Sequence, residues 1–330
     1  MASVPSTRIG LVGCGGRGIG HVKSVQELNG AEWIGGCDLD VERRKAFEDE
    51  TGLPSFEKFE DLLNESPDVI GVATNVQTHV PVGSLVLQAG IHLVVEKPLA
   101  TTAAEGKSLV QLAAEKGLKA AVSFQLHYNS FAATMRDVCK EIDPLLINHA
   151  RHSGVMPPQY LKPGMLTGCF DFLVHEIDLI RWWTGRQVEA ATARIGCGVY
   201  SDSEAPDLAI LHLDLSGDDY AAANVVASMG GSPLARNIQI AGKNGSLEAR
   251  FGNELRRNTG PGTQTVNVEI PPDELNGTAA LYRDLILSVH GEDVPDMPTL
   301  QDGLAANAII EAAFQSHREN RRVEIDPDCR

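Results

Sequence analysis

The strongest constraint on the fold is a glycine-rich turn that follows the first apolar segment of the chain. Residues 8–12 read as a short buried strand, and the residues after the turn read as a helix. The turn carries three glycines in the G-x-G-x-x-G spacing: Gly13, Gly15 and Gly18. A second strand follows this helix and ends at Asp38, 20 residues after Gly18. An acidic residue at that place distinguishes a dinucleotide-binding strand–helix–strand unit from a turn whose glycines only shape the backbone.

Each part of such a turn has a physical task. The first glycine permits the tight turn, the second lets the backbone approach a pyrophosphate, and the third allows the helix to pack closely on the sheet. The helix N-terminus adds N–H groups that attract anions. Asp38 is placed to accept hydrogen bonds from ribose hydroxyls and would repel a 2′-phosphate, which favours NAD over NADP. Arg43 and Arg44 keep the alternative open, because an arginine can swing toward a phosphate.

Alternating strand and helix patterns extend this unit over the first 125 residues. Buried strand-like runs recur at 31–37, 69–73, 91–95 and 119–124, with helical patterns between them. Continuous apolar strands linked by helices indicate a parallel sheet covered on both faces. We therefore predict an α/β fold whose residues 1–125 form a dinucleotide-binding Rossmann domain with a doubly wound parallel sheet.

A different pattern begins beyond residue 125. A strong helix is predicted over 169–184, and apolar residues then alternate with other residues along 208–215. Asn244-Gly245, between two strand-like segments, favours a two-residue hairpin turn. Helical patterns over about 274–290 and 300–318 complete the chain. We predict that 126–330 form an α+β domain with a largely antiparallel sheet, which binds substrate and forms oligomers.

Composition excludes several classes of protein. Acidic residues outnumber basic ones, 44 to 28, and the net charge of −16 suits neither a nucleic acid nor an anionic membrane surface. No apolar run approaches the roughly 20 residues that span a bilayer, and the first residues lack a signal-peptide core, so we expect a cytoplasmic protein. The six cysteines contain no C-x-x-C pair, so we expect buried free thiols rather than a zinc or dithiol site.

Two further segments carry groups suited to proton transfer. Glu96-Lys97-Pro98 follows an apolar strand, which places Lys97 at the sheet edge where open α/β sheets bind ligands. Three residues of the 169–184 helix share one face by their i, i+4 and i+7 spacing: Asp171, His175 and Asp178. A histidine oriented by a carboxylate suits acid–base chemistry near neutral pH. A surface turn and a packed histidine are the structural alternatives, and without a further His or Cys cluster we predict no metal site.

Taken in order, these motifs resemble the Gfo/Idh/MocA family of glucose-fructose oxidoreductases and inositol dehydrogenases. The resemblance covers essentially the whole chain, and its segments are Ile9–Gly18, Asp68–Thr74 leading to His79, Glu96–Leu99, and Asp171-x3-His175-x2-Asp178. The stretch His175-Glu176-Ile177-Asp178 particularly resembles inositol dehydrogenases. The resemblance implies a Rossmann domain followed by an α/β domain with an open, mostly antiparallel sheet. It also implies homodimers or homotetramers formed by pairing those sheets.

The same resemblance implies roles for individual residues. Lys97 would contact substrate and the nicotinamide ribose, His175 would be the acid/base, and Asp171 would orient His175 or the substrate. The residues expected to bind NAD are Gly13, Gly15, Gly16, Arg17, Gly18, Asp38, Thr74, Asn75, His79, Glu96 and Lys97. The residues expected to bind substrate are Lys97, His127, Asp171 and His175.

Three positions depart from the commoner family pattern. Many members have proline where Asn75 stands and glycine where Leu173 stands, and neither change disturbs the chemistry. The segment Gln125–Asn129, which often carries an arginine and reaches the pocket in the family, has none here. The identity of the substrate is therefore left open by this segment.

The function that these features favour is NAD-dependent oxidation of a secondary hydroxyl on a cyclitol or sugar, in a cleft between the domains. Two alternatives use the same scaffold: a glycoside hydrolase that retains NAD and oxidises its substrate transiently, and a non-catalytic sensor of the dinucleotide. The apolar residues Leu208 and Ile210, on the second face of the 208–215 segment, add the prediction of a homo-oligomer.

Overall fold

The computed structural model describes residues 6–154, 166–200, 204–217, 220–230 and 235–330. It divides into two compact units, each made of two pieces of the sequence. The first unit comprises Met1–Tyr128 with Leu275–Leu304, and the second comprises Asn129–Glu274 with Ala305–Arg330. The division predicted at residue 125 assigns all of 126–330 to the second domain. By packing, however, the segment 275–304 groups with the first unit.

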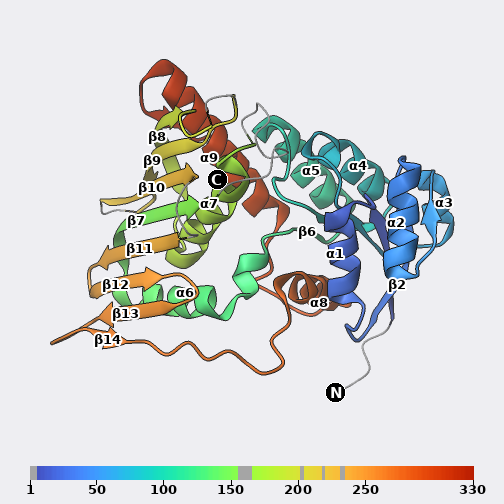
Figure 1. The fold of residues 1–330 in the computed structure, drawn as a ribbon, viewed down its shortest axis with the longest axis horizontal. Coiled ribbons are helices and arrows are strands. Elements are labelled where there is room, and N and C mark those ends of the chain that lie inside the picture. The colour runs from blue at the N-terminus through green and yellow to red at the C-terminus, as the bar shows by residue number, and fades with distance from the viewer. Residues whose placement is uncertain (1–5, 155–165, 201–203, 218–219, 231–234) are drawn as a thin grey trace. The chain divides into compact units, whose positions relative to one another are not determined.

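A six-stranded parallel sheet forms the centre of the first unit (Figure 1). Its strands lie in the order β3 (Ser55–Phe56), β2 (Ala31–Cys37), β1 (Thr7–Val12), β4 (Val69–Val72), β5 (His92–Val95) and β6 (Ala120–Val122). The helices of this unit are α1 (Gly16–Val25), α2 (Val41–Thr51), α3 (Phe59–Asn64), α4 (Val76–Gln88), α5 (Ala103–Lys116), the short 3-10 helix η1 (Gln125–Tyr128) and α8 (Gly277–Val289). The strand order reverses between β1 and β4, which is where doubly wound sheets bind ligands. The predicted Rossmann topology is confirmed.

Local sequence accounts for these elements. Every residue of β4 is buried, because helices cover both faces of a parallel sheet and no strand position faces water. Asp40 caps α2 as predicted, and its carboxylate accepts hydrogen bonds from the backbone of Glu42 and Arg43. Thr102 caps α5 in the same manner through the N–H of Glu105.

Helix α8 returns from the far end of the sequence to complete the first unit. It contacts α1, β6 and η1, and its residues Leu281, Tyr282 and Leu285 are fully buried. These three residues share one hydrophobic cluster with Ile9 and Val69 from the parallel sheet. Burial of this apolar surface explains why the segment groups with the first unit rather than with its sequence neighbours.

A nine-stranded sheet forms the second unit. Its strands lie in the order β14 (Gln264–Thr265), β13 (Glu254–Asn258), β12 (Gly245–Arg250), β11 (Ala235–Gly242), β7 (Pro144–Ser153), β10 (Ala221–Met229), β9 (Leu208–Leu215), β8 (Val188–Gly196) and β15 (Val323–Glu324). The pair β7–β10 is parallel and the other pairs are antiparallel, so the predicted mostly antiparallel sheet is confirmed. The helices are α6 (Ser130–Ile142), α7 (Phe170–Thr184) and the 3-10 helix η3 (Pro327–Cys329). Helix α9 (Leu300–Glu319) begins in the first unit and continues into the second.

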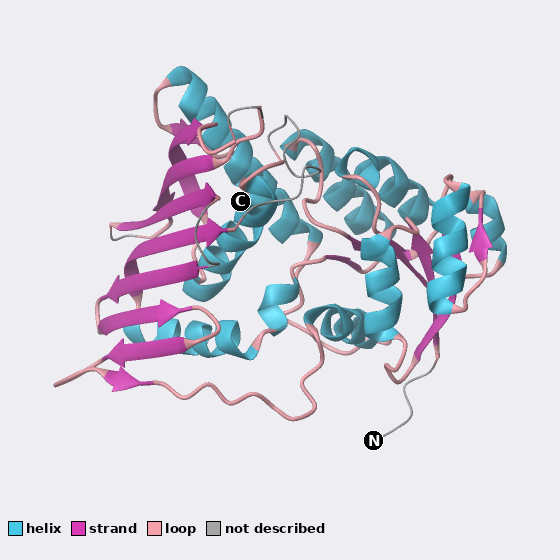
Figure 2. Ribbon diagram, in the orientation of Figure 1, coloured by secondary structure: helices cyan, strands magenta, loops and turns pink. Residues whose placement is uncertain are grey.

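Among the described residues, helices cover one face of this sheet and leave the other bare, as Figure 2 shows. Alternation along β9 follows from that arrangement: Leu211 and Leu213 are buried, whereas Leu208 and Ile210 are 40% and 57% exposed on the opposite face. We call this opposite face, toward which Leu208, Ile210, Asn148, Asn224 and Gln239 project, the open face.

Two details differ from the sequence predictions. The hairpin between β11 and β12 forms as predicted, but Gly242 pairs with Gly245, so its loop is Lys243-Asn244 rather than Asn244-Gly245. The backbone N–H groups of these two loop residues donate to the carbonyls of Asp143 and Ile142, which fixes that register. All six cysteines are free thiols and five are buried, whereas Cys197 is exposed.

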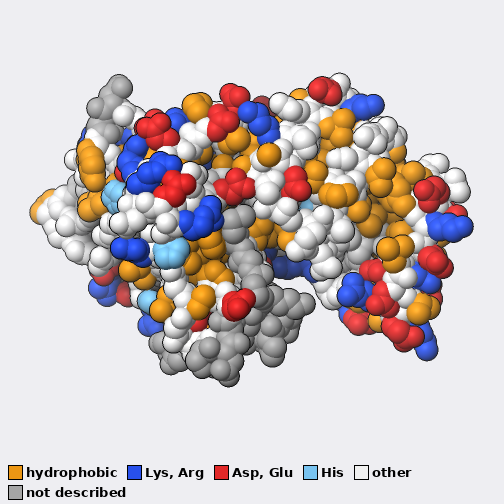
Figure 3. Space-filling view, turned by 90° about the horizontal axis from the view of Figure 1, so that it is seen from above, with side chains coloured by type: hydrophobic (Ala, Val, Ile, Leu, Met, Phe, Trp, Pro, Cys, Tyr) orange, Lys and Arg blue, Asp and Glu red, His pale blue; other side chains and the backbone are white. Residues whose placement is uncertain are grey.

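The described part of the chain contains no helix with the length and apolar character that crossing a membrane requires. On the surface shown in Figure 3, acidic and basic side chains are interspersed. Such a mixed surface offers no broad basic field to a polyanion, in keeping with the net charge of −16.

Candidate functional site

The glycine turn between β1 and α1 is tightly packed at Gly13 and Gly18 and open at Gly15 and Gly16. A side chain at Gly13, whose φ is +104°, would lie 2.5 Å from the carbonyl oxygen of Ala73, and one at Gly18 would lie 1.9 Å from that of Gly13. By contrast, nothing lies within 4 Å of the position that a Cβ would take at Gly15 or Gly16. The backbone there is open to close approach, and α1 begins at Gly16 with its N–H groups at the turn. This arrangement fits a pyrophosphate.

Asp38 is bound to this turn at the end of β2. Its Oδ2 accepts a hydrogen bond from the backbone N–H of Cys14 at 2.9 Å, and its Oδ1 accepts one from Asp40 at 2.9 Å. Arg43 lies 4.0 Å from the Asp38 carboxylate, and Arg44 donates to the Asp38 carbonyl oxygen at 2.8 Å. The charge of Asp38 therefore stands beside the turn, where NAD would place its adenosine ribose.

His79 connects the end of β4 with the segment that follows β5. The ring is buried, with Nδ1 2.8 Å from the carbonyl oxygen of Pro98 and Nε2 3.1 Å from that of Thr74. Burial lowers the pKa of His79, although the two carbonyl oxygens favour the protonated ring. Asn75 is the N-cap of α4, between Thr74 and His79 in the chain. These contacts fix the backbone next to Lys97.

Glu96 is a buried carboxylate beneath the same edge of the sheet. Its Oε1 lies 2.8 Å from Nε2 of His21 and 3.5 Å from Nε of Arg17, both on α1. Its Oε2 accepts a hydrogen bond from the backbone N–H of Lys97 at 3.2 Å. Burial alone would raise the pKa of Glu96, but the hydrogen bond and charge of His21, with the charges of Arg17 and Lys97, lower it to about 2. Glu96 is therefore ionised and joins the glycine turn's helix to the Lys97 segment.

The first unit thus brings the expected NAD-binding residues to one edge of its sheet, at the carboxyl ends of β1, β2, β4 and β5. Lys97 belongs to this group and is partly buried. His127 lies in η1 of the same unit, is buried, and stacks on Phe124 with ring centroids 6.4 Å apart. Its expected contact with substrate stays a prediction.

Helix α7 carries the other expected site residues, in the second unit. Asp171 and His175 are partly exposed one turn apart, and Asp178 on the same face is buried. The backbone N–H of Cys169, the N-cap, donates to the carbonyl oxygen of Pro206 at 2.7 Å and anchors the start of the helix. A carboxylate and an imidazole on neighbouring turns form a pair suited to taking a proton from a hydroxyl. Their roles remain predictions.

Sequence reasoning gave no role to three buried polar residues: His21, Tyr282 and Glu176. His21 and Tyr282 hydrogen-bond each other at 3.1 Å behind Glu96, and Glu176 lies fully buried beside His175 in the sequence. Glu176 had a signal: it follows Phe172 by four residues and precedes Ile180 by four, so it interrupts an apolar stripe. Contacts across 261 residues, such as His21 with Tyr282, leave no such local pattern.

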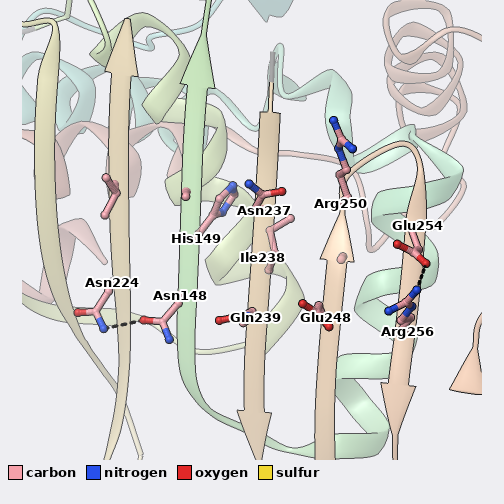
Figure 4. Close-up of a pocket in the computed structure, with 13 residues that line it drawn as sticks. Asn148, His149, Asn224, Asn237, Ile238, Gln239, Glu248, Arg250, Glu254 and Arg256 are labelled. Carbon is pink, nitrogen blue, oxygen red and sulfur yellow. Dashed lines mark hydrogen bonds and ion pairs between the residues drawn. The ribbon is translucent and has the colours of Figure 1, made fainter. Parts of the chain in front are cut away.

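A hollow of about 450 Å³ lies on the open face of the second unit. Figure 4 shows its polar side chains in line across neighbouring strands: Asn224, Asn148, Gln239, Glu248 and Arg256. Asn224 donates to Asn148 at 2.9 Å. None of the residues that line the hollow is an expected site residue. We therefore attribute the hollow to the shape of the sheet and give it no part in catalysis.

Comparison with known proteins covers both units. Residues 7–124 match the oxidoreductase family model described as an NAD-binding Rossmann fold, and residues 144–325 match the family's C-terminal alpha/beta domain. The solved structure of an oxidoreductase from Agrobacterium radiobacter, in complex with NAD+, L-tartaric acid and magnesium, is similar with a TM-score of 0.86. That similarity covers 97% of this chain and 98% of that chain at 20% identity, and it shows the shared fold.

Two curated relatives of this chain are dehydrogenases named for different substrates. An inositol 2-dehydrogenase of Salmonella typhimurium is 26% identical over 183 residues, which are 53% of this chain and 54% of the relative. The match therefore spans about half the length of that relative. A UDP-N-acetylglucosamine 3-dehydrogenase of Acidithiobacillus ferrooxidans is 24% identical over 327 residues, 93% of this chain and 95% of the relative. The two family models together span most of the chain, which therefore belongs to the Gfo/Idh/MocA oxidoreductase family, with its NAD-binding Rossmann fold in the first unit.

Proposed function

We propose that this protein is an NAD-dependent dehydrogenase that oxidises a secondary hydroxyl of a cyclitol or sugar. The observation that carries the proposal is the place of Lys97. Its segment is held to α1 through Glu96 and to the end of β4 through His79, so a lysine stands at the edge of the sheet that carries the glycine turn. A binding module would need the turn and Asp38 but has no use for this lysine.

The chemistry follows from three side chains. Bound NAD supplies a carbon that accepts a hydride from the alcohol carbon. We propose that His175 takes the hydroxyl proton while Lys97 holds the developing alkoxide. Asp171, one turn before His175, orients the imidazole or holds a neighbouring hydroxyl. The alcohol thus becomes a ketone, the electron pair leaves with the hydride, and the proton passes to His175.

The names of the relatives support the substrate class. Inositol 2-dehydrogenase, UDP-N-acetylglucosamine 3-dehydrogenase and D-apiose dehydrogenase are all named for the oxidation of polyols or sugars. Their identities to this chain are 24–26%, so they support a class of substrate rather than one compound. Stereochemical choice depends on pocket residues such as those of Gln125–Asn129.

The decisive test is a panel of inositols, aldoses, sugar phosphates and nucleotide sugars, with NAD or NADP, read by the absorbance of NADH. We expect steady NADH formation with at least one cyclitol or sugar. Release of an aglycone from a glycoside without net NADH would instead establish a hydrolase that retains NAD. Binding of NAD without turnover of any compound in either assay would favour a sensor.

We also propose that the protein is a homo-oligomer, dimer or tetramer, joined through the open face. The face carries the exposed apolar side chains Leu208 and Ile210 beside an ordered polar row, in which His212 Nδ1 lies 2.8 Å from Asn224 Oδ1. A broad sheet surface of this kind is more stable when a second copy covers it. The cytoplasmic location stays a prediction.

A further inference from the structure

A group of four charged or titratable side chains lies between α7 and the sheet of the second unit. The carboxylate of Glu176 is fully buried. Its Oε2 lies 2.9 Å from Nε2 of His149, and its Oε1 lies 3.0 Å from Nε of Arg236 and 3.8 Å from Nε of Arg151. We call these four residues the Glu176 cluster. The two arginine side chains are 16% and 14% exposed, so the whole cluster is largely removed from water.

Stability alone does not explain a carboxylate at this position. Glu176 interrupts the apolar stripe formed by Phe172 and Ile180, where another aliphatic residue would pack without desolvating a charge. Replacing a buried ion pair by apolar residues of similar volume is often neutral or stabilising, whereas a buried ionic group in some proteins fixes a single packing arrangement. Burial would raise the pKa of Glu176, but His149, Arg236 and Arg151 lower it to about 2, so the carboxylate is ionised.

The partners of Glu176 come from two neighbouring strands of the sheet. His149 and Arg151 lie two residues apart on β7, and Arg236 on β11 is the cross-strand partner of Arg151. Strands β7 and β11 are the fifth and fourth of nine in the sheet, so each is paired on both of its edges. The carboxylate is therefore attached to two strands at once.

The cations of the cluster also contact α7 above and below Glu176. Arg151 lies over the ring of Phe172, 5.3 Å from its centroid, and His149 stacks on Trp183 at 6.1 Å. Phe172, Glu176 and Trp183 span about three turns of the helix. Because the cluster contacts α7 at Phe172, Glu176 and Trp183, the helix can neither turn about its axis nor slide along it without breaking the ion pair.

We propose that Glu176 is a positioning residue for the oxidation: it fixes the rotation of α7 and thereby aims His175 and Asp171 at the reacting hydroxyl. The inference rests on the proposed function of those two residues. His175 precedes Glu176 directly, so any rotation at one is a rotation at the other. Misplacement of a reacting group by about 1 Å can cost on the order of 10²-fold in rate.

The test compares Glu176→Gln with the double variant Glu176→Gln/Arg236→Met. The single change keeps the side-chain shape but leaves the arginines without their counter-charge, so it can impair folding. The double change restores the net charge of the cluster, keeps Arg151 as its one arginine and still lacks the carboxylate anchor. Asp143→Asn is the matched control, because Asp143 also pairs with two cations, Arg186 and Lys243, at the surface of the same unit.

Each variant is assayed for kcat, KM and the isotope effect on kcat with substrate deuterated at the carbinol carbon. We expect kcat to fall roughly 10- to 100-fold in the single and double variants, with a larger isotope effect because the hydride step becomes slower. A change that only reduced the folded fraction would lower kcat and leave both KM and the isotope effect unchanged. Asp143→Asn should match the unmodified enzyme. Unchanged kcat and isotope effect in the folded double variant would overturn the proposal.

Hydrogen exchange separates this proposal from the proposed function. Amides of α7 around His175 should lose protection in the double variant and keep it in Asp143→Asn, whether or not a substrate is known. If no compound is oxidised by the unmodified protein, the dehydrogenase proposal fails, while loss of protection still supports the anchoring of α7. If the unmodified protein oxidises a substrate and the double variant keeps both its rate and its α7 protection, the positioning role is refuted.

Discussion

Nε2 of His21 lies 2.8 Å from Oε1 of Glu96, and this contact joins the helix after the glycine turn to the segment that carries Lys97. On the other side of the ring, Nδ1 lies 3.1 Å from the hydroxyl of Tyr282. One buried histidine thus links α1, the end of β5 and α8.

Glu96→Gln should reduce stability in a way that depends on pH. The folded protein lowers the pKa of Glu96 from 4.5 to about 2, so its contribution is fully present above pH 4.5 and is lost as the pH falls toward 2. We expect a loss on the order of 3 kcal/mol at pH 7. Urea midpoints of the two proteins should converge as the pH falls from 4.5 to 2. Glu50→Gln removes an exposed ion pair with Lys23. It should change the free energy of unfolding by less than about 1 kcal/mol at every pH.

Gly15→Ala and Gly18→Ala should separate binding from folding. A methyl group at Gly15 meets nothing within 4 Å, so the stability should change by less than about 0.5 kcal/mol. It would occupy the space of the pyrophosphate, so NAD affinity should fall about 10- to 100-fold, the cost of one charge-assisted hydrogen bond. At Gly18 it would lie 1.9 Å from the Gly13 carbonyl and should destabilise the unit by about 1–3 kcal/mol. Calorimetric titration with NAD and urea unfolding measure the two effects, and tight binding by Gly15→Ala would contradict this placement of the pyrophosphate.

Asp38→Ala combined with Leu39→Arg should shift the cofactor preference toward NADP. Leu39 is 88% exposed directly after Asp38, so an arginine there has room to reach a 2′-phosphate. We expect the ratio of NADP to NAD affinity to rise about 10- to 100-fold. Leu39→Arg alone keeps the carboxylate and should change the ratio less. Tighter binding of NADP than NAD by the unmodified protein would show that the interpretation of Asp38 is wrong.

Lys97→Ala and His175→Ala should each slow turnover by roughly 10²–10⁴-fold, because each removes a group that handles the hydroxyl proton or its charge. Affinity for NAD should survive in His175→Ala, since the pyrophosphate and ribose contacts lie in the first unit. Steady-state rates and NAD titrations measure the two effects. Lys116→Ala, at the exposed end of α5, serves as the control for loss of a lysine. Near-normal turnover in either site variant would remove that residue from the mechanism.

Ile210→Glu should convert the predicted oligomer to monomers, because it places a charge on the open face where we propose that a second copy binds. Ile270→Glu makes the same chemical change at a side chain that is 68% exposed and lies outside the sheet strands, so it should leave the assembly intact. Light scattering at micromolar concentration reports the mass of each protein. A monomeric unmodified protein would refute the assembly prediction.

The sequence predicted those elements whose burial follows a simple local rule. The uninterrupted apolar run of β4 and the alternation along β9 both reflect how many faces of each strand meet water. The end of an apolar strand placed Lys97 at the edge of the parallel sheet. The i, i+4 spacing put Asp171 and His175 on one face of a helix.

The support of the site depends on contacts between residues far apart in the sequence. Glu96 is 75 residues from His21, and Glu176 meets Arg236 only because β11 pairs with β7 in one register. A one-residue change of register would turn Arg236 to the open face, and local periodicity does not determine register. The charged partners of a buried carboxylate therefore emerge only from the folded structure.

The return of α8 to the first unit also delays the completion of that unit during synthesis. A ribosome that has released residues 1–274 has released all six strands of the parallel sheet but neither Tyr282 nor the apolar face of α8. His21 then lacks its hydroxyl partner, and the cluster around Ile9 and Val69 remains uncovered. The first unit is finished only after residues Asn129–Glu274 of the second unit have been synthesised, so the nascent chain holds its first sheet incomplete throughout that interval.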